Sequence, residues 1–454
     1  MELMPRQERG LRSVKRLSRS SILVTLLGAT VLVALAAAGI AGGASAPKPI
    51  LLSQNNCVGN AGAASCDVGW VLDHPNGVAL RGDGSGVLVT ATDSDALAVF
   101  KRERPAGTLT QNHGTTRPAC TSETGAGPCQ DGQAFIGPMG VGTTSDDSSV
   151  YVASNGSEAI DILNKERDSR QFVQGNGTAG CISEDGTGGQ CVDGRGLTGA
   201  SSIAIAPASD SVYVGGTSTI AAFKRNNSNG ALTQLPSPSG VSTDACINDD
   251  GSDGCFNGFV PGDVVSMAFS TDGKFLYAAV SGSPGALLVF SRTNSSRPLT
   301  ELATCYNADG SNGCTAVTGL DDPTGVALDR SAKNVYVAAS GSGKVVGLVR
   351  NKTTGLLTTS LTLPAVSVAN VNQITVASNN KSAYVTSDAG VTSFNRSKKT
   401  GVLTQGDCLT DSGGCIAPAG HGLAGGQGVV SASSYKDVYV AGSTDDAIVA
   451  LKHT

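Results

Sequence analysis

Val150-Tyr151-Val152 is a short apolar triplet centred on a tyrosine, and it returns along the chain. Copies of it, some of them looser, stand at 87–89, 212–214, 276–278, 335–337, 383–385 and 438–440. Successive copies begin 48 to 64 residues apart. Self-similarity at such a period indicates a repeat architecture in which each repeat is one supersecondary unit.

Each triplet has apolar stretches on both sides. The copy at 212–214 follows Ile203-Ala-Ile205 and precedes Ile220-Ala-Ala-Phe223, with Gly230-Ala-Leu-Thr233 after that. Turns rich in Gly, Asp, Asn and Ser separate these stretches, so each repeat holds four short strands. No stretch after residue 46 has sustained helical periodicity. The sequence therefore predicts an all-β fold, a seven-bladed β-propeller of four-stranded blades.

The two ends of the chain complete one another in this scheme. The seventh repeat supplies three strands and then stops at Thr454. Residues 49–54 run to Cys57 in the way that residues 297–301 run to Cys305. We therefore expect an N-terminal strand at 49–54 to join the last blade and close the ring, which removes an exposed sheet edge.

The composition agrees with this fold class. Of 454 residues 60 are Gly, only 15% are charged and only 4% are aromatic. A helical bundle needs more charged and helix-forming residues, and a hydrophobic share of 40% excludes a disordered acidic chain. Many short strands joined by Gly-rich turns fit best.

The first forty-six residues differ in kind from the rest. Six of residues 1–20 are Lys or Arg, an uncharged run follows at 22–40, and small residues end at Ala44-Ser45-Ala46. This order is typical of a secretory signal peptide. The apolar run is also long enough for a membrane anchor, which Pro47 favours. We expect 1–46 to be a signal peptide or N-terminal anchor and 47–454 to be a secreted or otherwise extracytoplasmic propeller.

The charge balance bears on the choice of partner. The whole chain has a formal net charge of −5, and the propeller is more acidic still because residues 1–46 are basic. An acidic body without a basic cluster argues against nucleic acid. We expect membrane contact only through a retained N-terminal segment, and a monomer whose partner is a protein or a glycan.

Twelve cysteines follow residue 56 and fall into six local pairs. Several pairs enclose a central Asp-Gly, which is a tight-turn signal. Zinc sites use pairs with only two to four residues between the ligands, so an even set in an exported chain predicts six local disulfides. The expected bridges are Cys57 with Cys66, Cys120 with Cys129, Cys181 with Cys191, Cys246 with Cys255, Cys305 with Cys314, and Cys408 with Cys415. The repeat near 358–386 has no cysteines, and we have no functional account of that gap.

The acidic turns raise the question of calcium. Asp249, Asp250 and Asp253 stand in one disulfide loop. The loop lacks the spaced ligands and the terminal Glu of a known calcium loop. We interpret it as a solvated turn held by its disulfide, with calcium as the alternative.

The residues also resemble a known family. Gly77-Val-Ala-Leu-Arg-Gly-Asp-Gly84, Val-Tyr-Val-Ala-Ser at 150–154 and Ala-Phe-Lys-Arg-Asn at 222–226 look like the lactonase-type and YVTN-type seven-bladed propellers. The resemblance covers nearly the whole chain after residue 46. It implies a propeller and, in some members, hydrolysis or formation of lactones by His, Glu and Arg side chains around the central channel, as in phosphogluconolactonase-type propellers.

The predicted inner strands, which line the channel, depart from that pattern. They are 78–80, 139–141, 202–205, 265–268, 326–328, 373–375 and 429–431. None of these stretches contains His, Glu, Asp or Arg. Acid–base catalysis needs a titratable group at the reacting atom, so the sequence assigns no catalytic residue and favours a protein that is not an enzyme.

One cluster of candidate binding residues remains, on the loops that lead into the first and seventh blades. Ring closure makes these blades neighbours, so their loops share one sector of the rim. His and Asp there could hold a divalent metal or a polar ligand. The alternative is that they are solvated loop residues. The candidates are His74, His421, Asp73, Asp93, Asp95, Asp445 and Asp446.

Three functions are consistent with the sequence. The first is an extracellular binding or scaffold module that uses its disulfide-braced loop face. The second is a lactone-acting hydrolase, as the resemblance implies. The third is a passive structural protein of the cell envelope. The uncharged channel wall favours the first, and no cofactor is predicted beyond the divalent metal of the His and Asp cluster.

Overall fold

The computed structural model describes residues 52–112, 119–166, 171–235, 246–294, 299–361, 370–411, 415, 421–434 and 436–453. The expected signal or anchor segment lies outside these residues, so that prediction stays open. Within the described ranges, no helix has the length and apolar character needed to cross a membrane.

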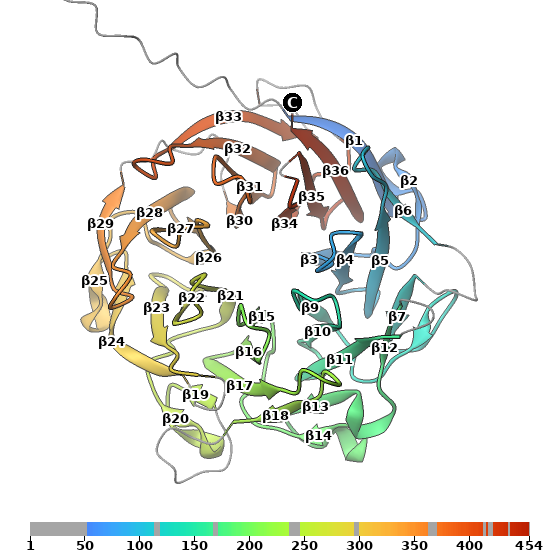
Figure 1. Ribbon diagram of the computed structural model, residues 1–454, viewed down its shortest axis with the longest axis horizontal. Helices are drawn as coiled ribbons and strands as arrows, with labels where there is room; N and C mark the ends of the chain where they lie inside the picture. Colours follow the sequence, from blue (N-terminus) through green and yellow to red (C-terminus); the bar gives the residue numbers. More distant parts are fainter. Residues whose placement is uncertain are drawn as a thin grey trace, which may run out of the picture. The chain divides into compact units, whose positions relative to one another are not determined.

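Seven β-sheets surround a central channel as the blades of a propeller, as predicted (Figure 1). Numbered in chain order, the blades begin with the inner strands β3 (Pro75–Leu80), β9 (Pro138–Thr143), β15 (Ser202–Ile205), β21 (Val264–Phe269), β26 (Pro323–Leu328), β30 (Val371–Val376) and β34 (Gly426–Ser431). These contain the seven predicted inner stretches.

The repeated triplets lie in the second strand of each blade. These strands are β4 (Gly86–Ala91), β10 (Ser149–Ser154), β16 (Ser211–Gly216), β22 (Phe275–Val280), β27 (Asn334–Ala339), β31 (Ser382–Ser387) and β35 (Asp437–Gly442). The third strands pair antiparallel with them and are β5 (Ala96–Arg102), β11 (Ala159–Lys165), β17 (Thr219–Arg225), β23 (Ala286–Ser291), β28 (Lys344–Arg350), β32 (Gly390–Arg396) and β36 (Ala447–His453).

The outer edge of each blade is more elaborate than the single fourth strand we predicted. Blades 4 to 6 have one outer strand, respectively β24 (Thr300–Asn307), β29 (Leu357–Leu361) and β33 (Leu403–Thr410). Blades 1 to 3 have two shorter ones, which are β6 (Leu109–Gln111) and β7 (Cys120–Ser122), β12 (Phe172–Gln174) and β13 (Cys181–Ser183), and β18 (Leu232–Gln234) and β19 (Cys246–Asn248).

All six predicted disulfides are present, and no described cysteine is free. Each bridge closes a loop within one blade, with its two cysteines 7 to 10 positions apart. The local pairing predicted from the spacing is therefore confirmed. The observed bridges join Cys57 with Cys66, Cys120 with Cys129, Cys181 with Cys191, Cys246 with Cys255, Cys305 with Cys314, and Cys408 with Cys415.

The disulfide loops account for the additional strands at the outer edges. In five of these loops the chain folds back after the first cysteine, so the residues after the second pair in parallel with the outer strand. The resulting strands are β2 (Asp67–Gly69), β8 (Gln130–Asp131), β14 (Val192–Asp193), β20 (Phe256–Asn257) and β25 (Thr315–Ala316).

Short 3-10 turns make the reversal in the disulfide loops. Gly251 and Gly310 stand at its start with φ of 73° and 79°, a conformation that glycine adopts without strain. These are the glycines of the predicted Asp-Gly turns. The turns are η1 (Ala63–Ser65), η2 (Gly177–Ala179), η3 (Gly186–Gly189), η4 (Ser252–Gly254) and η5 (Ser311–Gly313), of which η2 precedes its loop's first cysteine.

The seventh blade takes its outer strand from the other end of the chain. β1 (Leu52–Asn60) pairs antiparallel with β36, from Leu52 opposite His453 to Gly59 opposite Ala447. The two strands lie side by side in blue and red (Figure 1). β2 (Asp67–Gly69) then pairs in parallel with β1. Residues 49–51 of the expected strand lie outside the described residues, so closure by that segment stays a prediction.

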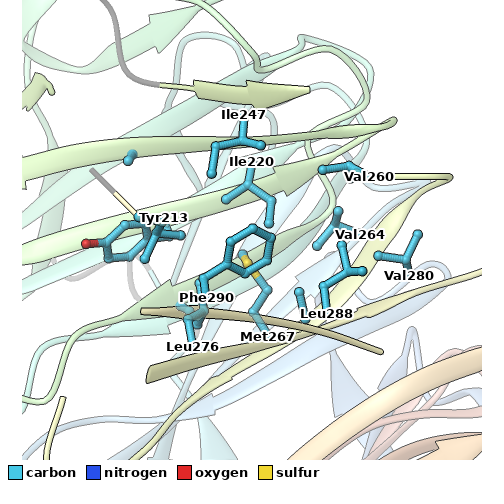
Figure 2. Packing of buried hydrophobic residues seen from close by; sticks show 14 of the residues in the cluster. Tyr213, Ile220, Ile247, Val260, Val264, Met267, Leu276, Val280, Leu288 and Phe290 are labelled. Atoms are coloured by element: carbon cyan, nitrogen blue, oxygen red, sulfur yellow. The ribbon is translucent and has the colours of Figure 1, made fainter. Parts of the chain in front are cut away.

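The hydrophobic core lies between neighbouring blades. The second strands are buried on both faces, and each contributes alternate side chains to the seams on its two sides. Between blades 3 and 4, Tyr213, Ile220 and Ile247 of one blade pack against Met267 and Phe290 of the next (Figure 2). Burial of such a continuous apolar layer is the main stabilisation of a repeat fold.

The tyrosine of each triplet also joins its blade to the next one. Tyr336 of blade 5 accepts a hydrogen bond from Arg396 Nε of blade 6 at 2.7 Å and donates one to the carbonyl of Gly401 at 2.5 Å. Arg396 also pairs with Asp329 at 2.5 Å, and both side chains are buried. Burial raises the pKa of Tyr336 to about 12, so its hydroxyl stays protonated and able to donate.

Four other seams have the same Tyr–Arg contact, which we call the clamp. The Arg–Tyr pairs are Arg102–Tyr439, Arg225–Tyr151, Arg292–Tyr213 and Arg350–Tyr277. Two seams differ. Tyr384 meets His453 Nδ1 at 3.0 Å instead of an arginine, and blade 1 has Leu88 where the tyrosine would be. Opposite Leu88, blade 2 carries Lys165, which pairs with Asp147.

The clamps and the disulfides lie on opposite rims of the ring, because successive strands are antiparallel. The turn rim holds the turns between first and second strands and those after the third strands, with the clamps. The loop rim holds the disulfide loops, the loops that lead into the inner strands and the turns between second and third strands.

Candidate functional site

The two candidate histidines lie on the loop rim with exposed side chains. His74 adopts φ of 55° and its backbone N–H donates to Asp446 Oδ1 at 2.9 Å. The backbone of His421 exchanges two hydrogen bonds with the side chain of Gln54. Both loops are therefore fixed through backbone atoms, which leaves the imidazoles facing solvent.

Two of the candidate aspartates connect adjacent blades. Asp446, in the turn between β35 and β36, accepts the His74 N–H of blade 1. Asp95, in the equivalent turn of blade 1, accepts the Gly137 N–H of blade 2 at 2.8 Å. A carboxylate that accepts a backbone N–H satisfies a donor of the next loop and fixes the angle between blades. This contact explains an aspartate at that turn without any ligand.

The structure brings part of the predicted cluster together. Asp73 and Asp93 are linked through their backbones. Burial is the largest cause that raises the pKa of Asp73, Asp446 and Asp93 raise it further, and His74 opposes them. Among the described residues, however, no group of three or more His, Cys, Asp or Glu side chains could hold a metal ion. That finding includes Asp249, Asp250 and Asp253, and Asp250 binds the backbone of its own turn at Ser252.

Asp445 takes part in a carboxyl pair that the sequence did not reveal. Its Oδ2 accepts the Ala424 N–H at 2.8 Å, while Asp411 Oδ1 accepts the Leu423 N–H at 3.1 Å. Burial, followed by the hydrogen bond to Asp445, raises the pKa of Asp411 to about 6. Two carboxyl groups in contact share a proton more readily than either isolated group.

Asp411 has a recognisable counterpart in other blades. The residue at the same place after the first cysteine accepts a backbone N–H from the loop leading into the next blade. Glu123 accepts from Phe135 at 2.6 Å, and Glu184 accepts from Leu197 at 2.5 Å. A polar residue three positions after the cysteine was therefore a usable signal for this contact, but not for the raised pKa.

The central channel opens on the loop rim as a cavity of about 320 Å³. All seven inner strands or the residues just before them contribute to its wall. Among the described residues, amides and hydroxyls line it together with Met and Val, and no charged side chain does. The observed wall therefore has the neutral character predicted from the inner strands.

A second cavity, of about 530 Å³, lies at the outer edge between blades 1 and 2. Among the described residues, its lining contains four cations, of which all but Arg104 form ion pairs with carboxylates. Arg81 binds Asp147 at 2.8 Å, and Lys101 binds Glu103 at 2.9 Å. Because these ion pairs already neutralise most of the cations, we place the candidate site elsewhere.

The loop rim carries exposed apolar side chains. The large hydrophobic residues that the described part of the chain exposes are Val68, Trp70, Ile136, Val192 and Phe256. Four of them lie in or directly after a disulfide-loop strand, and Ile136 leads into an inner strand. Trp70 is the only tryptophan in the sequence and is 44% exposed. The rim therefore combines apolar contact area with loops that disulfides hold in place.

Trp70 lies between the disulfide loops of two blades. Its backbone N–H donates to Gln111 Oε1 at 2.7 Å, and Gln111 Nε2 donates back to its carbonyl at 3.2 Å. Its ring lies beside Gly127, where a Cβ would be 3.9 Å from Cε3. The ring is thus held between blade 7 and blade 1, in the sector that also contains His74.

Comparison with known proteins identifies the fold. No protein-family model matches the chain, and no curated protein matches it in sequence. A putative 6-phosphogluconolactonase from Bacteroides fragilis is 16% identical with a TM-score of 0.50, over 76% of this chain and 85% of that one. Another from Bacteroides uniformis is 15% identical with a TM-score of 0.51, over 83% and 91% of the two chains.

A protein named for a different activity shares the fold equally well. The hydrazine synthase of Kuenenia stuttgartiensis is 12% identical with a TM-score of 0.51, over 85% of this chain and 97% of that one. At sequence identities this low, the similarity shows a shared propeller fold and nothing about activity, because one fold supports many chemistries. The seven-bladed propeller that the family resemblance implied is therefore confirmed. Membership of the YVTN-type family stays a prediction.

Proposed function

We propose that this protein is an extracytoplasmic binding or scaffold module that engages a protein or glycan through its loop rim. The observation that carries the proposal is the placement of the exposed apolar residues, which lie on disulfide-braced loops of that rim. Six disulfides also indicate an oxidising compartment.

Trp70 is central to the proposal. Tryptophan is enriched where binding energy concentrates, because it offers a large flat apolar face and one hydrogen-bond donor. Gln111 holds its backbone, and Gly127 lies beside its ring. A backbone that is fixed in advance does not have to be ordered when a partner covers the ring.

A lactone-acting hydrolase is the second candidate, favoured by the likeness in fold to two putative 6-phosphogluconolactonases. In the described part of the chain, the channel wall supplies amides, hydroxyls and apolar groups but no charged or imidazole side chain. Proton transfer in lactone opening needs a titratable group near the reacting atoms. This favours binding over hydrolysis, and a passive envelope role would not require an apolar loop rim.

Site-specific photo-crosslinking in cells that produce the full chain tests the proposal. A photoreactive residue at Val68 lies on the loop rim, and one at Lys399 lies in an exposed turn of the opposite rim as the matched control. We expect a discrete adduct, with a protein or with glycan, from position 68 and none from position 399.

Equal labelling from both positions, or none from position 68, contradicts the binding role. Replacement of Trp70 by Ser should reduce the adduct at position 68 without changing the melting temperature by more than a few degrees. In parallel, the purified oxidised protein should not hydrolyse 6-phosphogluconolactone or neutral lactones above the uncatalysed rate. Turnover there would favour the hydrolase.

A further inference from the structure

We propose that the mouth of the central channel is a separate binding site for a neutral polyhydroxyl molecule about the size of one sugar ring. The site is the 320 Å³ cavity on the loop rim, and it does not include the exposed apolar residues of the proposed binding rim. Its volume is at the small end of ligand pockets.

Amide side chains gather in one sector of the mouth. Asn372 and Gln373 come from blade 6, Gln427 from blade 7 and Asn76 from blade 1. These three blades are consecutive in the ring. Blades 2 and 4, on the other side, contribute Met139, Val141, Val265 and Met267 instead. The amides therefore gather in one sector, while the opposite sector combines Met and Val side chains with serine hydroxyls, among them Ser202 and Ser266.

Two of the amides keep their full hydrogen-bonding capacity. Within the described residues, the side chains of Asn76 and Gln427 make no hydrogen bond. The two backbones are adjacent, because a Cβ on Gly428, the residue after Gln427, would be only 2.4 Å from the Asn76 carbonyl oxygen. Each offers two donors and an acceptor toward the cavity.

The other polar groups of the wall are already engaged. Asn372 Nδ2 donates to Asp388 and to the Gly426 carbonyl, and Gln373 Nε2 donates to the Thr324 carbonyl at 3.0 Å. Thr324 Oγ1 donates to the Val371 carbonyl at 2.9 Å. These contacts position the wall, so ligand recognition falls mainly to Asn76 and Gln427.

The chemistry of the wall selects the ligand class. A hydroxyl group both donates and accepts, so it can bind the oxygen and the nitrogen of a side-chain amide. The C–H surface of a polyol or sugar ring suits the Met and Val sector. A phosphate, carboxylate or ammonium group would be desolvated without a counter-charge, which is unfavourable. Neutral polyols should therefore bind better than their charged derivatives.

Calorimetric titration of the full-length oxidised protein with D-glucose, myo-inositol and sorbitol tests this inference, with gluconate and glucose 6-phosphate as charged counterparts. We expect at least one neutral compound to bind, and its charged counterpart to bind at least tenfold more weakly. Asn76→Ala and Gln427→Ala should each weaken binding about tenfold, because each removes hydrogen bonds to the ligand.

Gln190→Ala is the matched control, since it removes an exposed amide from a disulfide loop of blade 2, outside the channel. It should leave the affinity unchanged, and circular dichroism should confirm that all three variants fold. Tight binding of the charged compounds, unchanged affinity in both channel variants, or no binding of any neutral compound up to about 50 mM would overturn the proposal. The channel variants should leave crosslinking from position 68 intact, so the two proposals fail independently.

Discussion

The two rims of the propeller join neighbouring blades by different means. On the turn rim, buried side chains from two blades meet in one network, as Tyr336, Arg396 and Asp329 do. On the loop rim, a single carboxylate such as Asp95 or Asp446 accepts a backbone N–H of the next blade. Disulfides there close each loop on itself and link no two blades.

The two rims should therefore tolerate substitution differently. A buried charged network is destabilised when one member is replaced, because the remaining charge has no partner. A loop that a local disulfide closes can change those of its side chains that do not contact the next blade without affecting that blade. We infer that the turn rim holds the ring together, while the loop rim is where binding residues can vary.

The largest expected effect comes from breaking one clamp. Arg396→Met leaves Asp329 buried without its partner, and should lower the free energy of unfolding by about 3–5 kcal/mol. Urea denaturation followed by circular dichroism measures it. Arg330→Met is the control on the same rim, because Arg330 is exposed. This substitution should lower the free energy of unfolding by less than about 0.5 kcal/mol. Equal effects from the two variants would remove the distinction between clamp and surface.

Breaking one disulfide should cost less. The double variant Cys305→Ser, Cys314→Ser opens a loop whose cysteines are 9 residues apart. In the chain-entropy model, a disulfide across such a loop stabilises the folded state by about 2–3 kcal/mol. Thermal unfolding gives the size of the loss, and limited proteolysis should locate new cleavage within 306–313. Cleavage in the neighbouring blades instead would show that the loop rim is not locally independent.

Removal of one hydroxyl from the clamp should have a smaller effect. Tyr336→Phe deletes the acceptor for Arg396 Nε and the donor to Gly401, and should cost about 1–2 kcal/mol. A double-mutant cycle with Arg396→Met, read by urea denaturation, should show strong coupling because the two side chains share one network. Simple additivity would mean that the clamp is not a unit.

The smallest effect should depend on pH. The raised pKa of Asp411, about 6, means that the folded protein favours the protonated carboxyl. Its contribution to stability is therefore complete below about pH 4 and is lost as the pH rises through 6. Asp411→Asn should remove that loss and stabilise the protein at pH 8 by about 1 kcal/mol, since solvent screening reduces the full value. Melting curves of both proteins should converge near pH 4; a constant offset would exclude titration of Asp411 as the cause.

The sequence predicts the strands and the bridges because their signals are local. Val150-Tyr151-Val152 and its copies are the continuous apolar runs of strands buried on both faces, and each pair of cysteines is separated by only 7 to 10 positions. The clamps escaped prediction because Tyr336 and Arg396 are 60 residues apart. An arginine at or just after the end of the third strand, one repeat after five of the six tyrosines, was the available signal.

The candidate site was predicted less well, for a related reason. Loop position predicted that His74 and Asp446 lie together, and they do, but through a backbone N–H rather than two side chains. His453, which is not among the candidates, is half-buried and contacts Tyr384. The role of a side chain depends on its rotamer and burial, which a pattern of residue types does not contain.

The pairing of β1 with β36 has a consequence for the order of events in biosynthesis. Leu52 pairs with His453, so it leaves the ribosome about four hundred residues before the strand that covers it. Six blades can be assembled while the last remains half-built with an open edge. Premature termination would therefore leave the first described strand unpaired, and a chaperone that shields β1 during synthesis would protect the chain while this edge is open.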